Sequence, residues 1–333
     1  MLRRLLSFLF KQVTQLRVIL YQRDFFKTVK INAKVISVGN LSVGGAGKTP
    51  MSIWITQKMN ERGIKTALIE KGYKSSLKAD EVFISDGSKN DNKNVGANII
   101  GDEPAMALKA LDGKALLCVS KDKTNGVLEL TKKHPELRCV VVDDGFQHLK
   151  LYRNLDVVLI DAQEGFSGKL MPMGKLRESY SALKRAHVLV FTKSDDVSDE
   201  VKKDLCSNAL SINGNLKIFF ANVRLFTSTN INGIKILPVS AVSNYGFFHT
   251  KLKSSGAVFE NYIAHRDHHS FCNDDLEYIV KLFKSTGADF VAYTSKDSVK
   301  IKEALTQKGI PTIEVWYEHE IEKAEEFLKL CIG

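Results

Sequence analysis

A glycine-rich stretch at residues 37–50, "SVGNLSVGGAGKTP", places one lysine and one threonine between an apolar run and an apparent helix. Backbone N–H groups can face an anion only where side chains do not block its approach, and the N-terminus of the following helix adds partial positive charge. We expect Lys48 to reach the β- and γ-phosphates of a nucleotide and the Thr49 hydroxyl to ligate Mg²⁺. An ordinary glycine-rich turn is the alternative, and Ser42 stands where the P-loop pattern has glycine. The predicted nucleotide-binding residues of this loop are Gly44, Gly45, Ala46, Gly47, Lys48 and Thr49.

A pair of acids follows another apolar run, in "CVVVDDGFQH" at 139–148. A P-loop requires a carboxylate at the end of a neighbouring strand, where it holds the metal and thereby positions the γ-phosphate. We therefore predict Asp143 and Asp144 as metal residues beside Thr49. Two acids are one more than the metal requires, so the second is available to the acceptor or the nucleotide. An acidic turn without a ligand is the structural alternative.

The sequence contains only part of a motif that would recognise the base of a nucleotide. Switch GTPases carry an N-K-x-D sequence that recognises guanine, and the nearest match is "TKSD" at 192–195. Because this match lacks the asparagine, guanine specificity has no support, and we expect the nucleotide to be ATP.

The elements that must position these residues alternate between short apolar runs and helical stretches. Continuous apolar runs are typical of strands buried on both faces, and their alternation with helices predicts a parallel sheet. The expected strands are 33–39, 65–70, 115–120, 139–144, 155–161 and 187–193, and the expected helices between them are 49–62, 102–112 and 123–134.

The pattern changes after about residue 215. Residues 216–226 and 233–243 are predicted to be paired strands, followed by a smaller α/β unit with helices at 275–285 and 297–308 and strands at 289–295 and 312–318. The predicted fold class is α/β, with a P-loop NTPase-type mainly parallel sheet flanked by helices, a second smaller α/β domain and an N-terminal amphipathic helix. The predicted divisions are 1–30 for the membrane-associating helix, 31–215 for the nucleotide-binding domain, 216–243 for a β connection and 244–333 for the smaller domain.

The first helix of the chain combines a wide apolar stripe with flanking cations. Leucine, valine and phenylalanine recur at helical spacing from residue 2 to residue 20. Eight lysines and arginines but only Asp24 among the acids fall in residues 1–34, so this segment holds +7 of the net charge of +10. The pattern predicts a helix lying in the plane of an anionic membrane surface. The alternative is a helix packed on its own domain with a solvated basic face.

The overall composition limits the remaining classes of protein. The chain has 333 residues, of which 44% are hydrophobic and 26% charged, as in ordinary globular proteins of one large or two moderate domains. The five cysteines show no CxxC spacing, which favours a reducing compartment. The sequence contains no run of about 18 uncharged apolar residues, so we expect no helix that spans a membrane. The basic residues form no stacking platform with aromatics, so no nucleic-acid partner is expected.

Six motifs, the glycine-rich loop and the acid pair among them, occur in one order along nearly the whole chain. They are "VGNLSVGGAGKTP" (38–50), "GDEP" (101–104), "VDDGFQH" (142–148), "LRE" (176–178), "DHHSF" (267–271) and "SKDSVK" (295–300). Together with the basic amphipathic start, this set resembles the tetraacyldisaccharide 4'-kinase family of the lipid A pathway. The resemblance implies transfer of the ATP γ-phosphoryl group to the 4'-hydroxyl of a tetraacylated glucosamine disaccharide 1-phosphate, in a cleft between two α/β domains. It also implies work at the cytoplasmic face of the bacterial inner membrane, where the N-terminal helix seats the enzyme.

The resemblance also implies roles for individual residues. It puts the catalytic base on Asp102 of "GDEP" and a supporting histidine on His268 of "DHHSF", with Lys48 completing the catalytic set. Arg177 and Glu178 match an Arg-Glu pair near the nucleotide and the metal. The structural alternatives are a helix N-cap for Asp102, a surface pair or metal ligands for the histidines, and a surface salt bridge for the Arg-Glu pair.

The chain departs from the family pattern at several positions. The family's Arg-Gly-Tyr-Gly reads "KGYK" at 71–74, an expected arginine is Lys121 or Lys123, and a Gly-Ile-x-x-Pro stretch reads "AVSNYG" at 241–246. Lysine keeps the charge but loses the bidentate geometry of arginine. These differences fall among the predicted contacts with the acceptor and leave the motifs of the phosphotransfer apparatus in place.

Two other functions remain open from the sequence. One is a P-loop ATPase or GTPase of the metallochaperone or partitioning type, whose turnover would be insensitive to lipid. The other is a membrane-docked ATP-binding regulator that transfers no group.

Overall fold

A twelve-stranded sheet runs through the computed structural model, which describes residues 2–85, 96–242, 244–267 and 269–333. The strand order is β10-β9-β11-β12-β8-β7-β6-β1-β5-β2-β4-β3, and the neighbouring strands are parallel except at the β12–β8 and β3–β4 pairs. The strands are β1 (Lys34–Asn40), β2 (Thr66–Lys71), β3 (Val82–Ser85), β4 (Leu116–Ser120), β5 (Cys139–Asp143), β6 (Leu155–Asp161), β7 (Val188–Thr192), β8 (Lys217–Thr227), β9 (Ile236–Ser240), β10 (Ile263–Ala264), β11 (Phe290–Thr294) and β12 (Thr312–Ile321).

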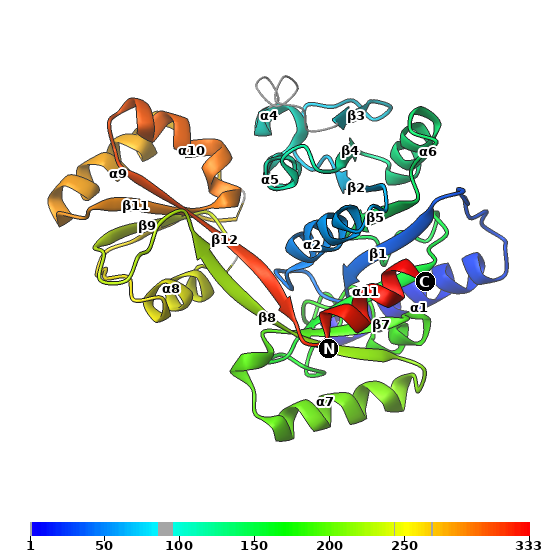
Figure 1. The fold of residues 1–333 in the computed structure, drawn as a ribbon. Coiled ribbons are helices and arrows are strands. Elements are labelled where there is room, and N and C mark those ends of the chain that lie inside the picture. The colour runs from blue at the N-terminus through cyan, green and yellow to red at the C-terminus, as the bar shows by residue number, and fades with distance from the viewer. Residues whose placement is uncertain (1, 86–95, 243, 268) are drawn as a thin grey trace.

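Helices cover both faces of this sheet (Figure 1). They are α1 (Leu2–Gln22), α2 (Lys48–Glu61), α4 (Ala97–Ile100), α5 (Asp102–Leu111), α6 (Lys123–Lys133), α7 (Asp199–Ile212), α8 (Tyr245–Ser254), α9 (Asn273–Thr286), α10 (Ser295–Gln307) and α11 (Ala324–Ile332). Two 3₁₀ helices, η1 (Tyr180–Arg185) and η2 (Ser194–Asp196), flank β7. The expected mainly parallel α/β fold with its N-terminal helix is confirmed.

The apolar residues of the larger part form separate cores on the two faces of the sheet. The core beneath α2, α5 and α11 includes Met51, Ile55 and Leu108, all at most 4% exposed. On the opposite face, α6 packs Val127 and Leu130 on β1, β2 and β5, and α7 covers β6 and β7. Since both faces are covered, the strands are continuously apolar, as the sequence indicated.

The smaller part is a three-layer unit built on β9, β11 and β12. Helices α9 and α10 bury residues such as Ile279 and Ile301 on one face, and α8 buries Phe248 on the other. The predicted helices and strands of this unit are confirmed within one or two residues at most ends.

One predicted strand pairing is wrong. We expected 216–226 and 233–243 to pair, but β8 lies between β7 and β12, while β9 lies between β10 and β11. The antiparallel partner of β8 is β12, with Val315 opposite Thr227 and Ile321 opposite Ala221. This long β8–β12 ribbon joins the two parts, as Figure 1 shows. The connection between the two parts therefore consists of two strands, β8 and, from near the C-terminus, β12.

The end of the chain returns to the larger part. Helix α11 packs Phe327 and Leu328 into the core beneath α2, and the Trp54 ring lies 6.0 Å from that of Phe327. The predicted smaller domain, 244–333, thus includes a segment that is buried in the first core. These apolar side chains cover one face of the sheet at β7 and β8 and stabilise the ribbon where it enters the larger part.

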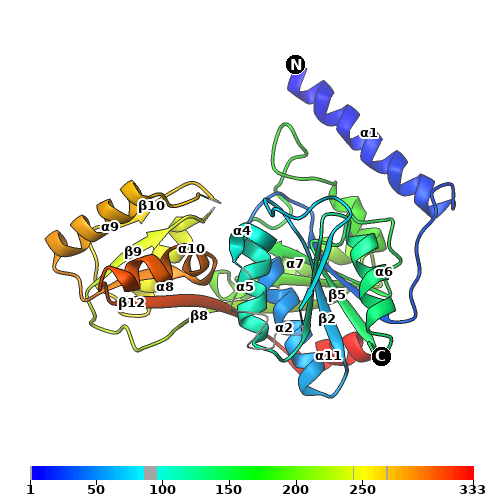
Figure 2. The same cartoon turned by 90° about the horizontal axis from the view of Figure 1, so that it is seen from above.

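Helix α1 projects from the body of the protein (Figure 2). Its apolar side chains are exposed, with Leu2 at 69% and Val13 at 66%, and Ser7 is its one buried residue. The Ser7 hydroxyl donates to the Leu170 carbonyl at 3.0 Å, which fixes the helix at one point. The apolar stripe is therefore not packed on the protein's own domain. Among the described residues, no helix has the length and apolarity to cross a membrane.

Candidate active site

The glycine-rich loop connects β1 to α2, as the sequence indicated, and forms the N-terminus of that helix. Gly47 caps α2 in the left-handed region with φ 79°, and a Cβ there would lie 2.7 Å from the His319 ring. The imidazole Nε2 of His319 donates to the Gly47 carbonyl at 2.8 Å, so β12 supports the loop from one side. A Cβ on Gly44 would meet nothing within 4 Å, so the other side of the loop is open to a ligand.

Asp143 ends β5 directly beside the start of α2. Its two carboxylate oxygens accept from Thr49 Oγ1 at 2.9 Å and from Ser52 Oγ at 2.7 Å. The carboxylate is 3% exposed, and burial raises its pKa, although Lys123 and the Ser52 hydrogen bond oppose that shift. A threonine hydroxyl and a carboxylate are oxygen ligands of the kind Mg²⁺ prefers, so these residues fit the predicted metal.

Asp144 turns the other way and pairs with cations. Its backbone is in the left-handed region with φ 44°, and its carboxylate accepts from Arg177 Nη2 at 2.7 Å and Nη1 at 2.9 Å. Lys48 Nζ lies 3.8 Å from the same carboxylate. Burial alone would raise its pKa, but the Arg177 guanidinium and Lys48 hold the pKa of Asp144 well below its usual range. The two adjacent acids therefore face different partners, one a hydroxyl pair and the other a cationic group suited to phosphate.

A second layer of charge lies beneath the acid pair, and the sequence reasoning did not identify it. Lys123 is 6% exposed, and its Nζ donates to the carbonyl oxygens of Asp143 and Asp144. Glu70 at the end of β2 is 2% exposed and lies near Asp143. Burial, and secondarily the charge of Asp143, raises the pKa of Glu70 well above its ordinary value. Of the two lysines considered for the missing arginine, Lys123 is the buried one.

Asp102 begins helix α5 and pairs with the smaller unit. The N-cap of α5 is Gly101, whose φ is 99° and where an added Cβ would lie 2.6 Å from the Tyr73 carbonyl oxygen, so a side chain is excluded there. The alternative of Asp102 as the N-cap is therefore wrong. Lys300 Nζ of α10 lies 2.7 Å from Asp102 Oδ2 and also donates to the His269 carbonyl at 3.2 Å. The segment that carries the "DHH" motif and Asp102 thus share Lys300.

His268, the predicted supporting histidine, lies outside the described residues. Its neighbour Asp267 accepts from Lys296 Nζ at 2.9 Å, and Lys296 also donates to Glu103 at 3.3 Å. Lys296 and Lys300 are accordingly cations of the cleft that bridge α5 and the smaller unit. Their side chains are 14% and 9% exposed, so they do not form a solvated helix start.

Glu178, the fourth predicted metal residue, is held in an ion pair. Its Oε1 accepts from Arg185 Nη2 at 2.7 Å, and the Arg185 guanidinium stacks 3.8 Å from the Phe146 ring centroid. The residue is 7% exposed. A metal role for Glu178 requires it to share or leave this pair, and it stays a prediction.

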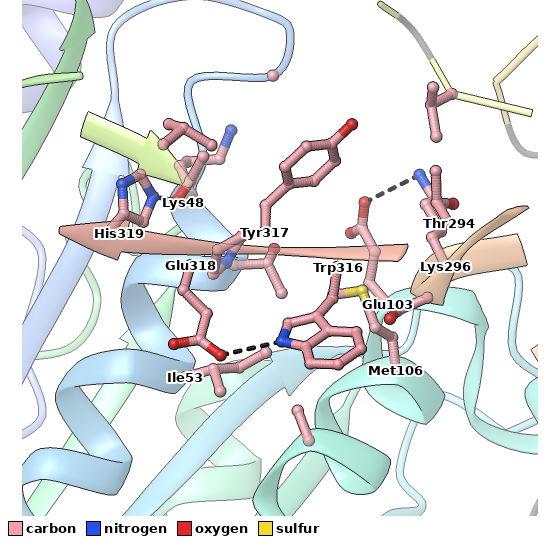
Figure 3. A pocket seen from close by; sticks show the side chains of 18 of the residues that line it. Lys48, Ile53, Glu103, Met106, Thr294, Lys296, Trp316, Tyr317, Glu318 and His319 are labelled. Carbon is pink, nitrogen blue, oxygen red and sulfur yellow. Dashed lines mark hydrogen bonds and ion pairs between the residues drawn. The ribbon is translucent and has the colours of Figure 1, made fainter. Parts of the chain in front are cut away.

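These elements surround a cavity of about 760 Å³, which is within the range of ligand pockets. Residues 44–50 form one wall, and Glu103, Asp267 and Lys296 lie on the opposite side. Figure 3 shows β12 crossing the cavity, with Trp316 and Glu318 directed to one side and Tyr317 and His319 to the other. Trp316 Nε1 donates to Glu318 Oε1 at 2.9 Å. The glycine-rich loop is therefore open to a large space that two separate units line.

The sequence offered no signal for the β12 residues of this cavity. Trp316, Tyr317 and His319 belong to no motif that we identified, and they reach the loop only because β12 pairs with β8. Burial lowers the pKa of His319 to about 4, against the hydrogen bond to Gly47, so its imidazole is neutral at neutral pH.

Comparisons with known proteins agree with this geometry. The family profile for tetraacyldisaccharide-1-P 4'-kinase matches residues 1–331. The chain belongs to the tetraacyldisaccharide 4'-kinase family. Relatives of that name include those of Bdellovibrio bacteriovorus, 30% identical over 319 residues (92% of this chain and 91% of the relative), and Desulfotalea psychrophila, 31% identical over 318 residues (91% and 88%). A crystal structure of LpxK from Aquifex aeolicus in complex with ATP matches 100% of this chain and 99% of its own, with a TM-score of 0.73 and 25% identity.

Membership in the tetraacyldisaccharide 4'-kinase family confirms the predicted enzyme class, an ATP-dependent kinase of lipid A biosynthesis. It does not favour the metallochaperone-type NTPase or the regulator that transfers no group. The individual roles of Asp102, His268, Arg177 and Glu178 remain predictions.

Proposed function

We propose that this chain transfers the γ-phosphoryl group of ATP to the 4'-hydroxyl of a tetraacylated glucosamine disaccharide 1-phosphate, with Mg²⁺ held by Thr49 and Asp143. The observation that carries the proposal is the meeting of a P-loop, an acid pair and helix α5 at one cavity. The ATP complex of the Aquifex aeolicus relative supports ATP as the nucleotide. Mg²⁺, when bound, neutralises charge on the phosphate oxygens.

Asp102 is the proposed general base. A sugar hydroxyl is a poor nucleophile until a group accepts its proton as the new O–P bond forms and the bond from the γ-phosphorus to the bridging oxygen breaks. Asp102 lies one residue before Glu103, which lines the cavity, and its side chain is 17% exposed. Lys300, which pairs with it, positions the carboxylate. His268 is proposed to support this base from the "DHH" segment.

Arg177, Lys48 and Asp144 are proposed to bind the phosphates. Arg177 already binds a carboxylate through two nitrogens, which is also the geometry for a phosphoryl group. Lys48 lies between the loop carbonyl of Gly44 and Asp144, within 3.4 and 3.8 Å, so both cations are prepositioned without a ligand. Phosphate oxygens would replace the carboxylate as their partner.

The division into units supports a cleft that closes. We propose 31–215 as the nucleotide-binding domain and the unit that contains β9, β11 and α8 to α10 as the acceptor-side domain, with β8 and β12 as the connection between them. Lys296 and Lys300 join the two across the cavity through Glu103 and Asp102. Closure would then bring the "DHH" segment to the acceptor.

The proposed location is the cytoplasmic face of the inner membrane. Four acyl chains hold the acceptor in the bilayer, since each buried CH₂ contributes about 0.8 kcal/mol. The exposed apolar stripe of α1 and the +7 charge of residues 1–34 support binding to anionic lipid. The enzyme thus meets its acceptor at the membrane surface.

The activity is tested with radiolabelled ATP and a tetraacylated disaccharide 1-phosphate, analysed by thin-layer chromatography. We expect a labelled lipid that depends on added Mg²⁺. Release of inorganic phosphate at a rate that lipid does not change would instead indicate an NTPase, and ATP binding without turnover would indicate a regulator. Either result would remove the kinase proposal.

The membrane role is tested by flotation with anionic vesicles. We expect deletion of residues 1–24 to leave the protein in the soluble fraction, and Val13→Glu to weaken flotation strongly. Gln12→Glu is the matched control, because it adds the same charge at an exposed polar position without removing an apolar side chain. Unchanged flotation of the deletion would mean that another surface binds the membrane.

A further inference from the structure

Two histidines and an aspartate converge in the smaller unit, near the start of α9. His265 follows β10, His269 lies in the loop that leads to α9, and Asp275 is in the first turn of α9. His269 Nε2 lies 2.8 Å from Asp275 Oδ2, and His265 Nε2 lies 3.9 Å from Asp275 Oδ1. Within the described part of the chain, these three residues form the one group whose ligand atoms all lie within 4.8 Å of one another.

The separations fit a tetrahedral metal ion. Zinc–nitrogen and zinc–oxygen bonds of about 2.0–2.2 Å place tetrahedral ligand atoms about 3.3 Å apart. The two measured distances, 2.8 and 3.9 Å, lie on either side of that value. Small side-chain rotations would therefore bring the three ligand atoms to coordinating distance. The side chains are 25%, 32% and 19% exposed, which leaves an entry path and an open coordination position.

The cluster is held in place by its surroundings. The two imidazole rings stack with centroids 4.1 Å apart at 5°, and Phe271 meets both of them edge-on at 5.3 Å. Asp275 also accepts from the Cys272 N–H at 2.9 Å, so the helix start orients its carboxylate. The ring contacts and the carboxylate contact therefore keep the three side chains together.

We propose that His265, His269 and Asp275 form a binding site for a borderline divalent metal ion of the Zn²⁺ class. Two imidazoles and one carboxylate select Zn²⁺, Co²⁺ or Ni²⁺ over Mg²⁺. The proposed ligands are different residues from those proposed for phosphotransfer, and the proposal does not rest on the kinase function. The His269 carbonyl accepts from Lys300, the partner of Asp102, so a bound ion would also hold that carbonyl in place.

The test uses the full-length protein with its purification tag removed, without nucleotide and with excess Mg²⁺ to occupy the acid pair. Zn²⁺ affinity is measured by competition with a chromophoric chelator, and Co²⁺ provides the visible absorption bands of a low-symmetry site. We expect one equivalent to bind and His265→Ala to lose at least tenfold in affinity together with the Co²⁺ bands. His134→Ala is the matched control, because His134 also pairs with a carboxylate, its Nδ1 lying 3.3 Å from Glu136, but belongs to no such cluster among the described residues.

Cys272 provides the second arm of the test, since it is exposed and neighbours the site. Cys272→Ser keeps a side-chain oxygen for the helix cap, and we expect it to change the Zn²⁺ affinity by less than threefold. Equal affinity for the unmodified protein and His265→Ala would overturn the proposal. A loss of Zn²⁺ binding in Cys272→Ser alone would also overturn it, because the metal would then be bound by the Cys272 thiolate.

Discussion

The two walls of the central cavity are built in different ways. The wall formed by β1, α2 and β5 is closed by hydrogen bonds within one domain: Thr49 and Ser52 hold Asp143, and Arg177 holds Asp144. The opposite wall is held to it by ion pairs that join separate units, with Lys300 on Asp102 and Lys296 on Glu103. The phosphate side is therefore complete in one domain, whereas the base is positioned by a residue from the other.

This difference has a chemical consequence. If the proposed roles hold, nucleotide binding requires only the first wall, because the loop, both acids and Arg177 come from residues of the larger part. Proton abstraction by Asp102 would then require both walls, because Lys300 of α10 pairs with that carboxylate. Variants of the two walls should thus separate binding from turnover.

The largest expected effect is that of Asp102→Asn. A general base contributes typically about 10²–10⁴-fold, so we expect kcat to fall by at least about 100-fold. ATP affinity should change by less than about threefold, since the phosphate wall is intact. Kinase assays and nucleotide titration measure the two quantities.

Glu103→Gln is the matched control for Asp102→Asn, because it makes the same chemical change one residue further along α5 and also removes a partner of a cleft lysine. We expect it to lower kcat by less than about tenfold. If kcat fell equally in both variants, the ion pairs would act only in closure of the cleft. Asp102 would then not be the general base.

The first wall could be predicted from the sequence because its parts are local. A strand, a glycine-rich loop and a helix follow one another within residues 34–61, and the acids come directly after another apolar run. Such motifs carry their own geometry, since the loop and the helix N-terminus are formed by adjacent residues. The helix start at Lys48 and the strand end at Asp143 were each within one residue of expectation.

The second wall could not be predicted in the same way because its contacts join distant residues. The apolar patterns of β8 and β9 indicated strands but not their partners, and the true partner of β8 lies about 90 residues away in β12. Lys300 belongs to the "SKDSVK" motif, but that motif does not name Asp102 as its partner, and His319 was part of no motif. The contacts of both depend on the packing of α10 and β12, which local sequence does not specify.

A smaller effect is expected from Arg177→Lys on the first wall. Lysine keeps the charge but loses the paired hydrogen bonds to Asp144, which are 2.7 and 2.9 Å long. Charge-assisted hydrogen bonds contribute about 1.5–3 kcal/mol, so we expect kcat/KM for ATP to fall roughly 10–100-fold. Arg185→Lys is the matched comparison, because Arg185 pairs with Glu178. A larger loss of kcat/KM in that variant would assign phosphate binding to Arg185 instead of Arg177.

The smallest expected effect concerns His319, on the strand that joins the two walls. Its pKa is lowered by burial to about 4, so the folded protein binds a proton there less readily than the unfolded chain, where histidine has a pKa of about 6.5. The resulting stability is fully present above pH 6.5 and is lost as the pH falls toward 4. Urea unfolding at pH 8 and pH 5 should show that the unmodified protein loses about 2 kcal/mol more over this interval than His319→Gln does. His148, whose pKa burial also lowers to about 4, is present in both proteins, so its contribution cancels. An equal loss in the two proteins would mean that folding leaves the pKa of His319 at its ordinary value, and that burial on β12 does not hold the imidazole neutral.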